Sequence, residues 1–535
     1  MAMLNLFNLA FAWIVLPLIL LITKYAVASR RPKNFPPGPP GLPIIGNLHQ
    51  LPVRKGFLKQ HEWTKEYGSI IGLKLGPLNA VVLNSHRHVS ELVKGFKALL
   101  FDKRGAIYSG RPENYVGREL ICPNEIHILL AQYGAGWRTL RKSVQGLLNV
   151  AAVDALHPIQ TAEATQTMCQ LLDDPAGYYD HIRRYSTAVI LASVFGQRGE
   201  SFQSPKVQAL YHAQDRFTAI LETGATPPVD AFPFLKATPE FLSPWKKEAN
   251  GIRQEQSSLY FKLLDETRDR IRKGNSTSCF MEKLMDDQEK IGFSDEQVAY
   301  LGGILMEAGS DTTSSTLLTF VLAMTQNPGV LRKAQEEVDR ICSSEKSPTF
   351  DDIGQLEYLS ACMNETLRWR PIAPGGIPHM LIQDDNYGEY FLPKGTILFA
   401  NTWAIHMDES EYEEPDRFLP ERFLGNKFGS KTEVTDKHRR TTYGFGAGRR
   451  VCPGQKLAEN SLMLNIAKMV WLFDIKSTSA APLDVSMSSA FSDGFIVAPK
   501  KFPVEFVPRS DKRVQVIRDE FEKSEEYLGR FGKET

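Results

Sequence analysis

The sequence predicts a mainly α-helical protein with small β-sheets, an α+β fold in which one large domain follows an N-terminal transmembrane helix. Three observations favour this fold class. The first 23 of the 535 residues carry no charged side chain. The middle of the chain is mostly helical in pattern, while β-like segments are few and short. Residues 46–508 contain no second linker and no internal repeat, so they are predicted to form one domain.

The N-terminal segment is predicted to anchor the protein in a membrane. Apolar side chains dominate residues 1–25, and roughly 20 such residues span the hydrocarbon of a bilayer. A cleaved signal peptide is the alternative, but it would need a basic start and a shorter apolar core. Basic residues follow the span and none precedes it. The positive-inside rule therefore predicts a single-pass protein with its large domain in the cytosol. We expect the membrane to be that of the endoplasmic reticulum.

Two segments flank the predicted domain. Residues 26–45 form a basic and proline-rich linker, and because proline fixes the backbone we expect a stiff extended spacer that holds the domain off the bilayer. Residues 509–535 form a charged C-terminal tail. We expect a surface helix or partial disorder there, and no catalytic residue.

Within the domain, strands are expected at residues 70–75, 80–83, 391–399 and 502–507. The clearest helix covers residues 294–326, opening with a capping box from Ser294 to Gln297 and closing before an Asn-Pro pair. A second helix at residues 356–369 ends where an arginine precedes a proline.

Charge and cysteine content exclude several classes of function. The formal net charge is +1 without a long block of one sign, so no nucleic acid partner is expected. The six cysteines are scattered and form no C-x-x-C pair, which disfavours a disulfide framework and a zinc site. A reducing compartment fits best, and the glycosylation motifs at Asn275 and Asn364 are then unused.

A glycine-rich loop near the C-terminus surrounds one cysteine. The segment Phe445-Gly-Ala-Gly-Arg-Arg-Val-Cys-Pro-Gly454 places Cys452 just before a helix-like run. A helix N-terminus stabilises a thiolate, and Arg449 and Arg450 suit carboxylates. A dinucleotide loop is the alternative for Gly444-Phe-Gly446, but its third glycine is misplaced. The loop therefore favours a thiolate ligand at Cys452.

This loop resembles the haem-binding signature F-x-x-G-x-R-x-C-x-G of the cytochrome P450 family, filled here by Phe445, Gly448, Arg450, Cys452 and Gly454. The resemblance covers residues 36–508 and is closest to the microsomal type. It implies the cytochrome P450 fold with haem b as cofactor, Cys452 as the axial ligand of the iron, and Phe445, Arg450 and Gly454 as further cofactor contacts.

A second motif set resembles the structural network of the same family. Glu365 and Arg368 lie one helical turn apart and can pair, although in isolation they would be interpreted as a solvated surface pair. The segment Pro420-Glu-Arg-Phe423 precedes the cysteine by about thirty residues. The resemblance implies a buried network of Glu365, Arg368 and Arg422 that holds the haem-side core.

The long helix contains Ala308-Gly-Ser-Asp-Thr-Thr313, which resembles the oxygen-activation motif of the family. Asp and Thr are poor helix formers, so a functional reason for them is plausible, and an ordinary polar turn of a surface helix is the alternative. The resemblance implies that Asp311 and Thr312 are catalytic and organise proton delivery. It also implies haem contacts by Trp137 and Arg141, from a W-x-x-x-R helix, and by His379.

The resemblance implies a monooxygenase that inserts one oxygen atom from O₂ into a lipophilic small molecule. The chain has no flavin or nicotinamide motif, so electrons are expected from an NADPH-cytochrome reductase that docks near Arg449 and Arg450. The run Asn401–His406 with the proline-rich hinge is similar to fungal enzymes that tailor secondary metabolites. We expect the substrate pocket to be lined by residues 115–128, 209–235, 375–377 and 491–495, with Met306 and Ala308.

Two other functions are compatible with the haem loop. A haem-thiolate isomerase or dehydratase works without a reductase, but such relatives usually lack the acid and threonine found here. A membrane-tethered haem-binding protein without turnover is the other alternative.

Overall fold

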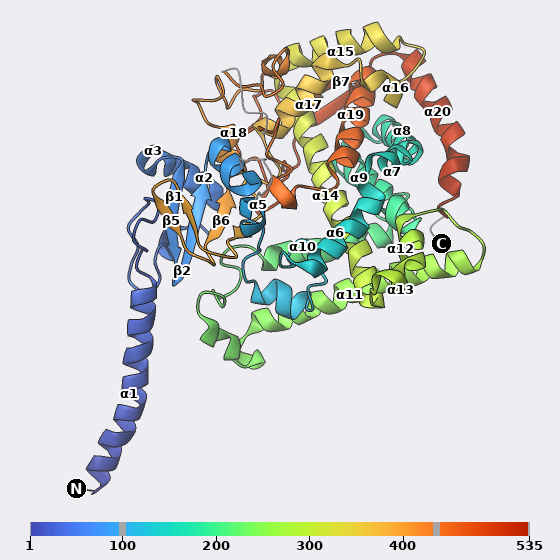
Figure 1. Cartoon of the computed structure of the whole chain (residues 1–535). Helices are drawn as coiled ribbons and strands as arrows, with labels where there is room; N and C mark the ends of the chain where they lie inside the picture. The colour runs from blue at the N-terminus through green and yellow to red at the C-terminus, as the bar shows by residue number, and fades with distance from the viewer. Residues whose placement is uncertain (1, 96–102, 432–438, 533–535) are drawn as a thin grey trace.

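The computed structural model describes residues 2–95, 103–431 and 439–532, and helices form most of this part of the chain (Figure 1). The first ten α-helices are α1 (Ala2–Ala28), α2 (Gly56–Glu62), α3 (Thr64–Tyr67), α4 (His86–Val89), α5 (Lys103–Ile107), α6 (Ala135–Leu148), α7 (Val150–Asp154), α8 (His157–Asp173), α9 (Tyr178–Phe195) and α10 (Pro205–Ile220). The others are α11 (Pro244–Arg272), α12 (Phe280–Asp286), α13 (Gln288–Ile291), α14 (Asp295–Gln326), α15 (Pro328–Cys342), α16 (Phe350–Ile353), α17 (Glu357–Trp369), α18 (Thr402–His406), α19 (Gln455–Leu472) and α20 (Asp511–Gly529). The fold class is therefore mainly α with small sheets, as predicted.

The strands of the described chain form three small sheets. They are β1 (Ile70–Leu75), β2 (Leu78–Leu83), β3 (His379–Met380), β4 (Asp385–Tyr387), β5 (Tyr390–Leu392), β6 (Ile397–Ala400), β7 (Phe473–Ser477) and β8 (Val504–Pro508). The largest sheet has the order β1-β2-β6-β3. Its β2 and β6 are parallel, with Ala80 opposite Ile397, and its other pairs are antiparallel. The remaining pairs, β4-β5 and β7-β8, are antiparallel hairpin-like sheets.

The strand expected at residues 391–399 is wrong as a single element. Two strands occupy this region, and they belong to different sheets. The chain turns between them at Pro393 and Gly395, where Gly395 has a φ of +81° and the Thr396 amide donates to the Pro393 carbonyl at 3.1 Å. Proline and a left-handed glycine are turn residues, so continuous apolar character was a poor guide here.

Helix α14 crosses the middle of the helical body (Figure 1). It begins at the predicted capping box, in which Ser294 accepts the Gln297 amide and the Gln297 side chain accepts the Ser294 amide. It packs against α9, α11, α17 and α19 and is buried along most of its length. The alternative of a polar turn on a surface helix does not fit this packing, because the helix is interior even though Ala308 is exposed and Asp311 and Thr312 are only partly buried.

Helix α1 projects away from the domain (Figure 1). The membrane-spanning helix expected at residues 1–25 is not found: in the part of the chain that the structure describes, no helix is long and apolar enough to cross a membrane. The side chains of residues 1–12 and 14, on which much of that prediction rests, lie outside the described part.

The proline-rich segment contacts the domain and does not form the expected free spacer. The Arg31 guanidinium donates to three carbonyl oxygens, those of Pro36 (3.1 Å), Pro39 (3.1 Å) and Gly72 (3.0 Å). Phe35 is buried against β1 and β2. A Cβ on Gly72 would lie 2.4 Å from the Pro36 carbonyl oxygen, so the segment packs directly on the strand. Prolines have no backbone N–H to donate. The carbonyl oxygens of Pro36 and Pro39 accept hydrogen bonds from the Arg31 side chain instead.

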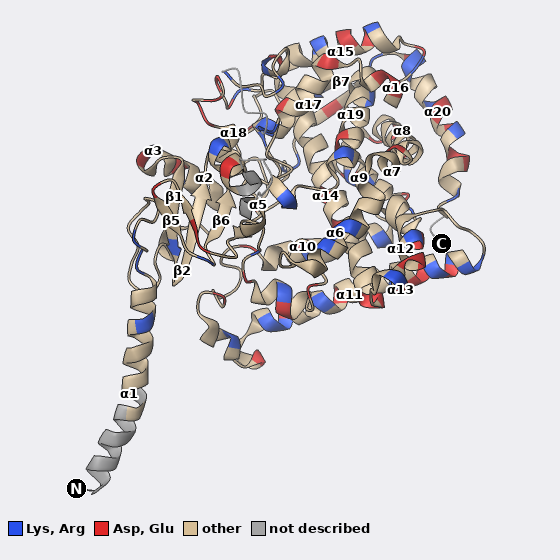
Figure 2. Ribbon diagram, in the orientation of Figure 1, with Lys and Arg blue, Asp and Glu red and all other residues tan. Residues whose placement is uncertain are grey.

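The charged tail forms helix α20, which packs against α8 and α19 at one side of the molecule (Figure 1). Ile517 and Leu528 are buried. Glu520 pairs with Lys468 at 2.9 Å, and Lys468 on α19 is almost fully buried. Figure 2 shows charged residues on outer helices such as α11, α15 and α20.

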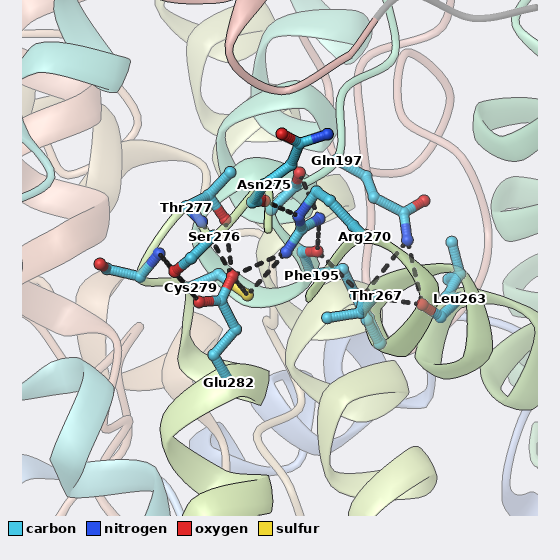
Figure 3. Close-up of polar contacts among 12 residues, drawn as sticks. Phe195, Gln197, Leu263, Thr267, Arg270, Asn275, Ser276, Thr277, Cys279 and Glu282 are labelled. Carbon is cyan, nitrogen blue, oxygen red and sulfur yellow. Dashed lines mark hydrogen bonds and ion pairs between the residues drawn. The ribbon is translucent and has the colours of Figure 1, made fainter. Parts of the chain in front are cut away.

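A polar cluster joins the end of α9 to α11 and α12 (Figure 3). The Arg270 guanidinium donates to the carbonyls of Phe195 and Gly196, both at 2.7 Å, and pairs with Glu282 at 2.8 Å. Thr267 adds a hydrogen bond of 3.0 Å to the Phe195 carbonyl. The last carbonyls of a helix have no partner within it, so Arg270 caps α9 from a neighbouring helix.

Candidate active site

Cys452 lies in a closed loop immediately before α19. Its amide donates to the Phe445 carbonyl at 2.9 Å, and Gly446 and Gly448 take the positive φ angles of +70° and +67° that the loop requires. The other five cysteines are buried, whereas Cys452 is only partly buried. Among the six cysteines, it is therefore the one that is not fully buried.

Opposing effects act on the Cys452 thiol. Burial raises its pKa, while a hydrogen bond from the Gly454 backbone and the charges of Arg141 and Arg440 lower it. Arg141 lies on α6 and donates to the Val451 carbonyl at 2.7 Å. Burial is the largest of these effects, so the pKa of the thiol is raised overall, and the Gly454 hydrogen bond, Arg141 and Arg440 offset only part of the increase.

Arg450 points into the protein, so of the two arginines expected near a docking partner only Arg449 is exposed. The Arg450 guanidinium lies 4.3 Å from the centre of the buried Trp137 ring. It donates to the carbonyls of Ser109 (3.0 Å), Ile128 (3.3 Å) and Ala131 (2.7 Å).

His379 lies beside Arg450 and a residue that sequence reasoning missed, Arg111. Burial first, and then the charges of Arg111 and Arg450, lower the pKa of His379 to about 3, so its imidazole is neutral at pH 7. Its Nδ1 lies 2.7 Å from the Tyr108 carbonyl, which leaves Nε2 as the free ring nitrogen. Arg111 is buried and donates to the carbonyls of Leu129, Ile377 and Pro378. No family motif marked Arg111.

These cationic groups lack acidic partners. In the described residues no carboxylate forms an ion pair with Arg111, Arg141 or Arg450. Burial first, and then the nearby Arg450, lower the pKa of Arg111 to about 9. Buried charges are normally paired. The cluster of Arg111, Arg141 and Arg450 therefore fits the two negatively charged carboxylates of a haem.

Helix α14 is interior, but part of its surface at residues 308–312 is accessible. Ala308 is exposed, while Met306 and Ser310 beside it are buried. The Thr312 hydroxyl donates to the Ala308 carbonyl at 2.8 Å and is itself accessible. The middle of this interior helix therefore keeps accessible surface along this turn. A partly buried cysteine, unpaired cations and this accessible surface together fit a bound haem.

Asp311 does not share the open face with Thr312. Its carboxylate lies 3.9 Å from the Arg183 guanidinium on α9. Burial raises the pKa of Asp311, and Arg183 lowers it while Asp215 raises it further. Asp311 thus lies in a cluster of charged groups with Arg183 of α9 and Asp215 of α10. Arg183 is another functional candidate that the motifs did not indicate.

The structure brings Glu365, Arg368 and Arg422 together. Arg368 donates to both carboxylate oxygens of Glu365 at 2.7 Å, and Arg422 donates to the same carboxylate at 3.1 Å. Glu365 and Arg368 have no exposed surface. The surface-pair alternative is excluded, since Arg368 also donates to the carbonyls of His406 and Pro415.

The expected pocket segments separate into two groups. Residues of 115–128 and 209–235 share an apolar cluster with Met306, whereas Phe491 packs in another cluster with Phe57 and Trp403. A surface cavity of about 790 Å³ lies elsewhere, between α2, α3, α4 and residues 404–411, and none of the predicted site residues lines it.

Comparisons with known proteins agree with this geometry. The sequence profile described as Cytochrome P450 matches residues 36–506. Similar proteins include the cytochrome P450 monooxygenases yanC of Aspergillus niger (36% identical, 95% of this chain, 96% of that one) and patH of Penicillium expansum (37%, 95% and 95%). A zebrafish cytochrome P450 solved with progesterone is 25% identical, with a TM-score of 0.69 over 85% of this chain and 99% of that chain.

The fold and the cysteine-centred site define a haem-thiolate protein. The chain belongs to the cytochrome P450 family, whose cofactor is haem with an axial thiolate.

Proposed function

We propose that the protein is a monooxygenase that inserts one oxygen atom from O₂ into a lipophilic small molecule, with Cys452 as the thiolate ligand. The observation that carries this proposal is the closed glycine-rich loop that places Cys452, the one cysteine that is not fully buried, at the start of α19 beside Arg141. The two fungal relatives named above are called monooxygenases, which supports the same reaction.

We further propose that the haem carboxylates are held by Arg111 and Arg450, and that His379, Trp137 and Arg141 complete this side. When bound, a thiolate-ligated haem activates O₂ because the ligand favours cleavage of the O–O bond. The neutral His379 donates its one ring proton from Nδ1 to the Tyr108 carbonyl, so its Nε2 can only accept, and the two arginines contribute the charge-assisted hydrogen bonds to the carboxylates. The buried network of Glu365, Arg368 and Arg422 keeps α17 fixed behind this side.

Proton delivery is assigned to Thr312 and Asp311 in different roles. The Thr312 hydroxyl holds a proton at the open turn of α14, where its bond to the Ala308 carbonyl fixes its direction. Asp311 faces Arg183, so it can release or accept a proton only when that pair at 3.9 Å loosens. Arg183 is therefore a positioning residue for Asp311.

Electrons are proposed to come from an NADPH-cytochrome reductase, since the chain carries no flavin or nicotinamide motif. The exposed Arg449, next to the partly buried Arg450, is one basic group that such a donor could contact. The fungal relatives support a tailoring step in secondary metabolism, with a lipophilic substrate in the apolar cluster around Met306.

We propose that α1 attaches the protein to the endoplasmic reticulum membrane from the cytosolic side. Large exposed apolar side chains support attachment: Trp13 is 75% exposed and Leu20 is 61% exposed. The segment with Phe241 (83%) and Leu242 (67%) adds to this surface, and Tyr25 of α1 contacts the same segment through ring pairs with Phe232 and Phe234. Removal of α1 together with Phe241→Ser should release the protein from microsomes.

The reduced carbon monoxide complex tests the proposed function. The wild type should show the absorption band of a thiolate-ligated ferrous haem, and Cys452→Ser should lose it while Cys169→Ser keeps it. Product formation that requires NADPH and reductase separates the monooxygenase from a reductase-independent isomerase. A normal band in Cys452→Ser would assign the ligand to another residue.

A further inference from the structure

Glu307 is a buried carboxyl on α14 that the proposed reaction does not use. It is 6% exposed and immediately precedes Ala308, the open residue of the helix. Its Oε1 accepts from the Tyr260 hydroxyl and from Gln256 Nε2 (3.0 Å), both on α11. Burial raises its pKa to about 7 although both hydrogen bonds lower it. No Lys or Arg of the described chain forms an ion pair with it, so the carboxyl is costly to keep in this place.

His127 faces the second oxygen of this carboxyl. The ring is 3% exposed and stacks on Phe217 of α10, with centroids 5.4 Å apart. Its Nδ1 accepts the Leu129 amide at 3.3 Å, so in the neutral ring the proton is on Nε2. This Nε2 is a buried donor without a hydrogen-bond partner in the described chain, and Glu307 Oε2 lies 3.9 Å away.

The pair lies in the wall of the haem site. The residues that follow His127 accept hydrogen bonds from the cationic group: Ile128 from Arg450 and Leu129 from Arg111. Glu307 approaches from the other side, next to the open turn of α14. His127 and Glu307 therefore connect the haem-carboxylate side of the site to the oxygen-binding turn.

The spacing of the two atoms fits one hydroxyl group. A hydroxyl oxygen about 2.9 Å from the imidazole nitrogen and about 2.7 Å from the carboxylate oxygen would subtend about a right angle across the gap. One group could then accept from His127 and donate to Glu307. A buried N–H without a hydrogen-bond partner is unfavourable. A network with a structural role alone would therefore be expected to pair the Nε2–H of His127.

We propose that His127 and Glu307 recognise a hydroxyl group of the substrate, which is therefore a lipophilic alcohol or phenol. This inference rests on the proposed monooxygenase function and names its substrate class. The imidazole N–H donates to the hydroxyl oxygen, and the hydroxyl donates to Glu307 Oε2. The hydroxyl so fixed sets which part of the substrate reaches Ala308 and Thr312.

Two probes of equal ring size test the proposal in the full-length haem-loaded protein. Dissociation constants for 1-naphthol and naphthalene are measured from the change in the haem absorption spectrum. The hydroxyl should give 1-naphthol roughly a tenfold tighter binding, the value of one or two hydrogen bonds. His127→Phe keeps a ring stacked on Phe217 but has no N–H. This variant should therefore bind 1-naphthol and naphthalene with about equal dissociation constants, and its affinity for naphthalene should be unchanged.

Further variants keep the test decisive if His127→Phe folds poorly. His127→Gln retains an N–H donor and should keep a preference, while Glu307→Gln should weaken it. His212→Phe on α10 is the control, since His212 is 64% exposed.

Equal binding of both probes by the wild type, no binding of 1-naphthol, or a preference unchanged in His127→Phe would overturn the inference. The carbon monoxide band of each preparation is recorded alongside. Its absence in the wild type would refute the proposed function itself, whereas a normal band with equal probe binding would refute only the hydroxyl site.

Discussion

At the scale of single residues, Arg111 is expected to retain the haem although no motif marks it. A charge-assisted hydrogen bond contributes roughly 1.5–3 kcal/mol. Arg111→Leu should therefore accelerate haem loss by about tenfold or more, measured as transfer of haem to an excess of a haem-scavenging protein. Arg272→Gln, at a side chain that is 74% exposed, is the control. An unchanged transfer rate would show that Arg111 only braces the backbone carbonyls around it.

Thr312 provides a second prediction at this scale. Thr312→Ala should keep haem and substrate binding but lose the proton held at the open turn of α14, and proton positioning contributes roughly a hundredfold. Product per NADPH should fall sharply while hydrogen peroxide rises. Thr319→Ala is a matched control, because Thr319 makes the same bond to the carbonyl four residues earlier but is fully buried. Normal coupling in Thr312→Ala would assign proton delivery to another group.

The residues that sequence reasoning missed share one property. Motif residues such as Cys452 and Glu365 were predictable because their spacing is local. Arg111, Arg183 and His127 gain their significance from partners more than 80 residues away along the chain. Such contacts depend on how elements pack, and a single sequence does not contain that information.

At the scale of elements, the cluster that joins α9, α11 and α12 predicts a defined response to acid (Figure 3). Burial alone would raise the pKa of Glu282, but hydrogen bonds from Ser276, Thr277 and Arg270 outweigh it and lower the pKa to about 2. The ionised Glu282 therefore contributes stability, by less than about 3 kcal/mol because solvent screens this partly exposed carboxylate. This contribution is present in full above the ordinary pKa of 4.5 and is lost as the pH falls toward about 2.

Thermal unfolding at several pH values checks this prediction. Glu282→Gln lacks the contribution, so the gap in melting temperature between wild type and variant should be widest near neutral pH and should narrow below about pH 4.5. The exposed Glu289→Gln on the neighbouring α13 should follow the wild type throughout. A gap that stays constant with pH would show that ionisation of Glu282 is not the cause.

Element prediction succeeded where a local signal was strong. The capping box fixed the start of α14, and an arginine before a proline marked the end of α17. It failed at residues 391–399, where a turn divides two apolar strands. For the tail it did not decide between a surface helix and disorder, because the many charged residues of α20 obscure the pattern of its buried Ile517 and Leu528. In the tail the deciding term is tertiary packing, whereas at residues 391–399 it is the local turn at Pro393 and Gly395.

At the scale of the whole molecule, the boundary of the domain lies earlier than the sequence pattern indicates. The pattern placed the linker at residues 26–45, because prolines disfavour regular structure. The structure instead has Arg31 and Phe35 bound to the sheet, and the Ile44 amide donates to Ser29 Oγ at 2.9 Å. The proline-rich segment is thus part of the folded domain, and α1 is the segment outside it.

Two truncations test this boundary. A chain that begins at Ser29 retains every contact of the proline-rich segment, so it should take up haem and keep the melting temperature of the full chain. A chain that begins at Gly46 loses the three hydrogen bonds of Arg31 and the buried Phe35 ring. Burial of one such ring and a few hydrogen bonds are together worth about 3 kcal/mol or more, so this chain should melt several degrees lower. Equal stability of the two truncations would show that the proline-rich segment is a spacer outside the fold. Failure of the Ser29 chain to bind haem would show that α1 is part of the fold.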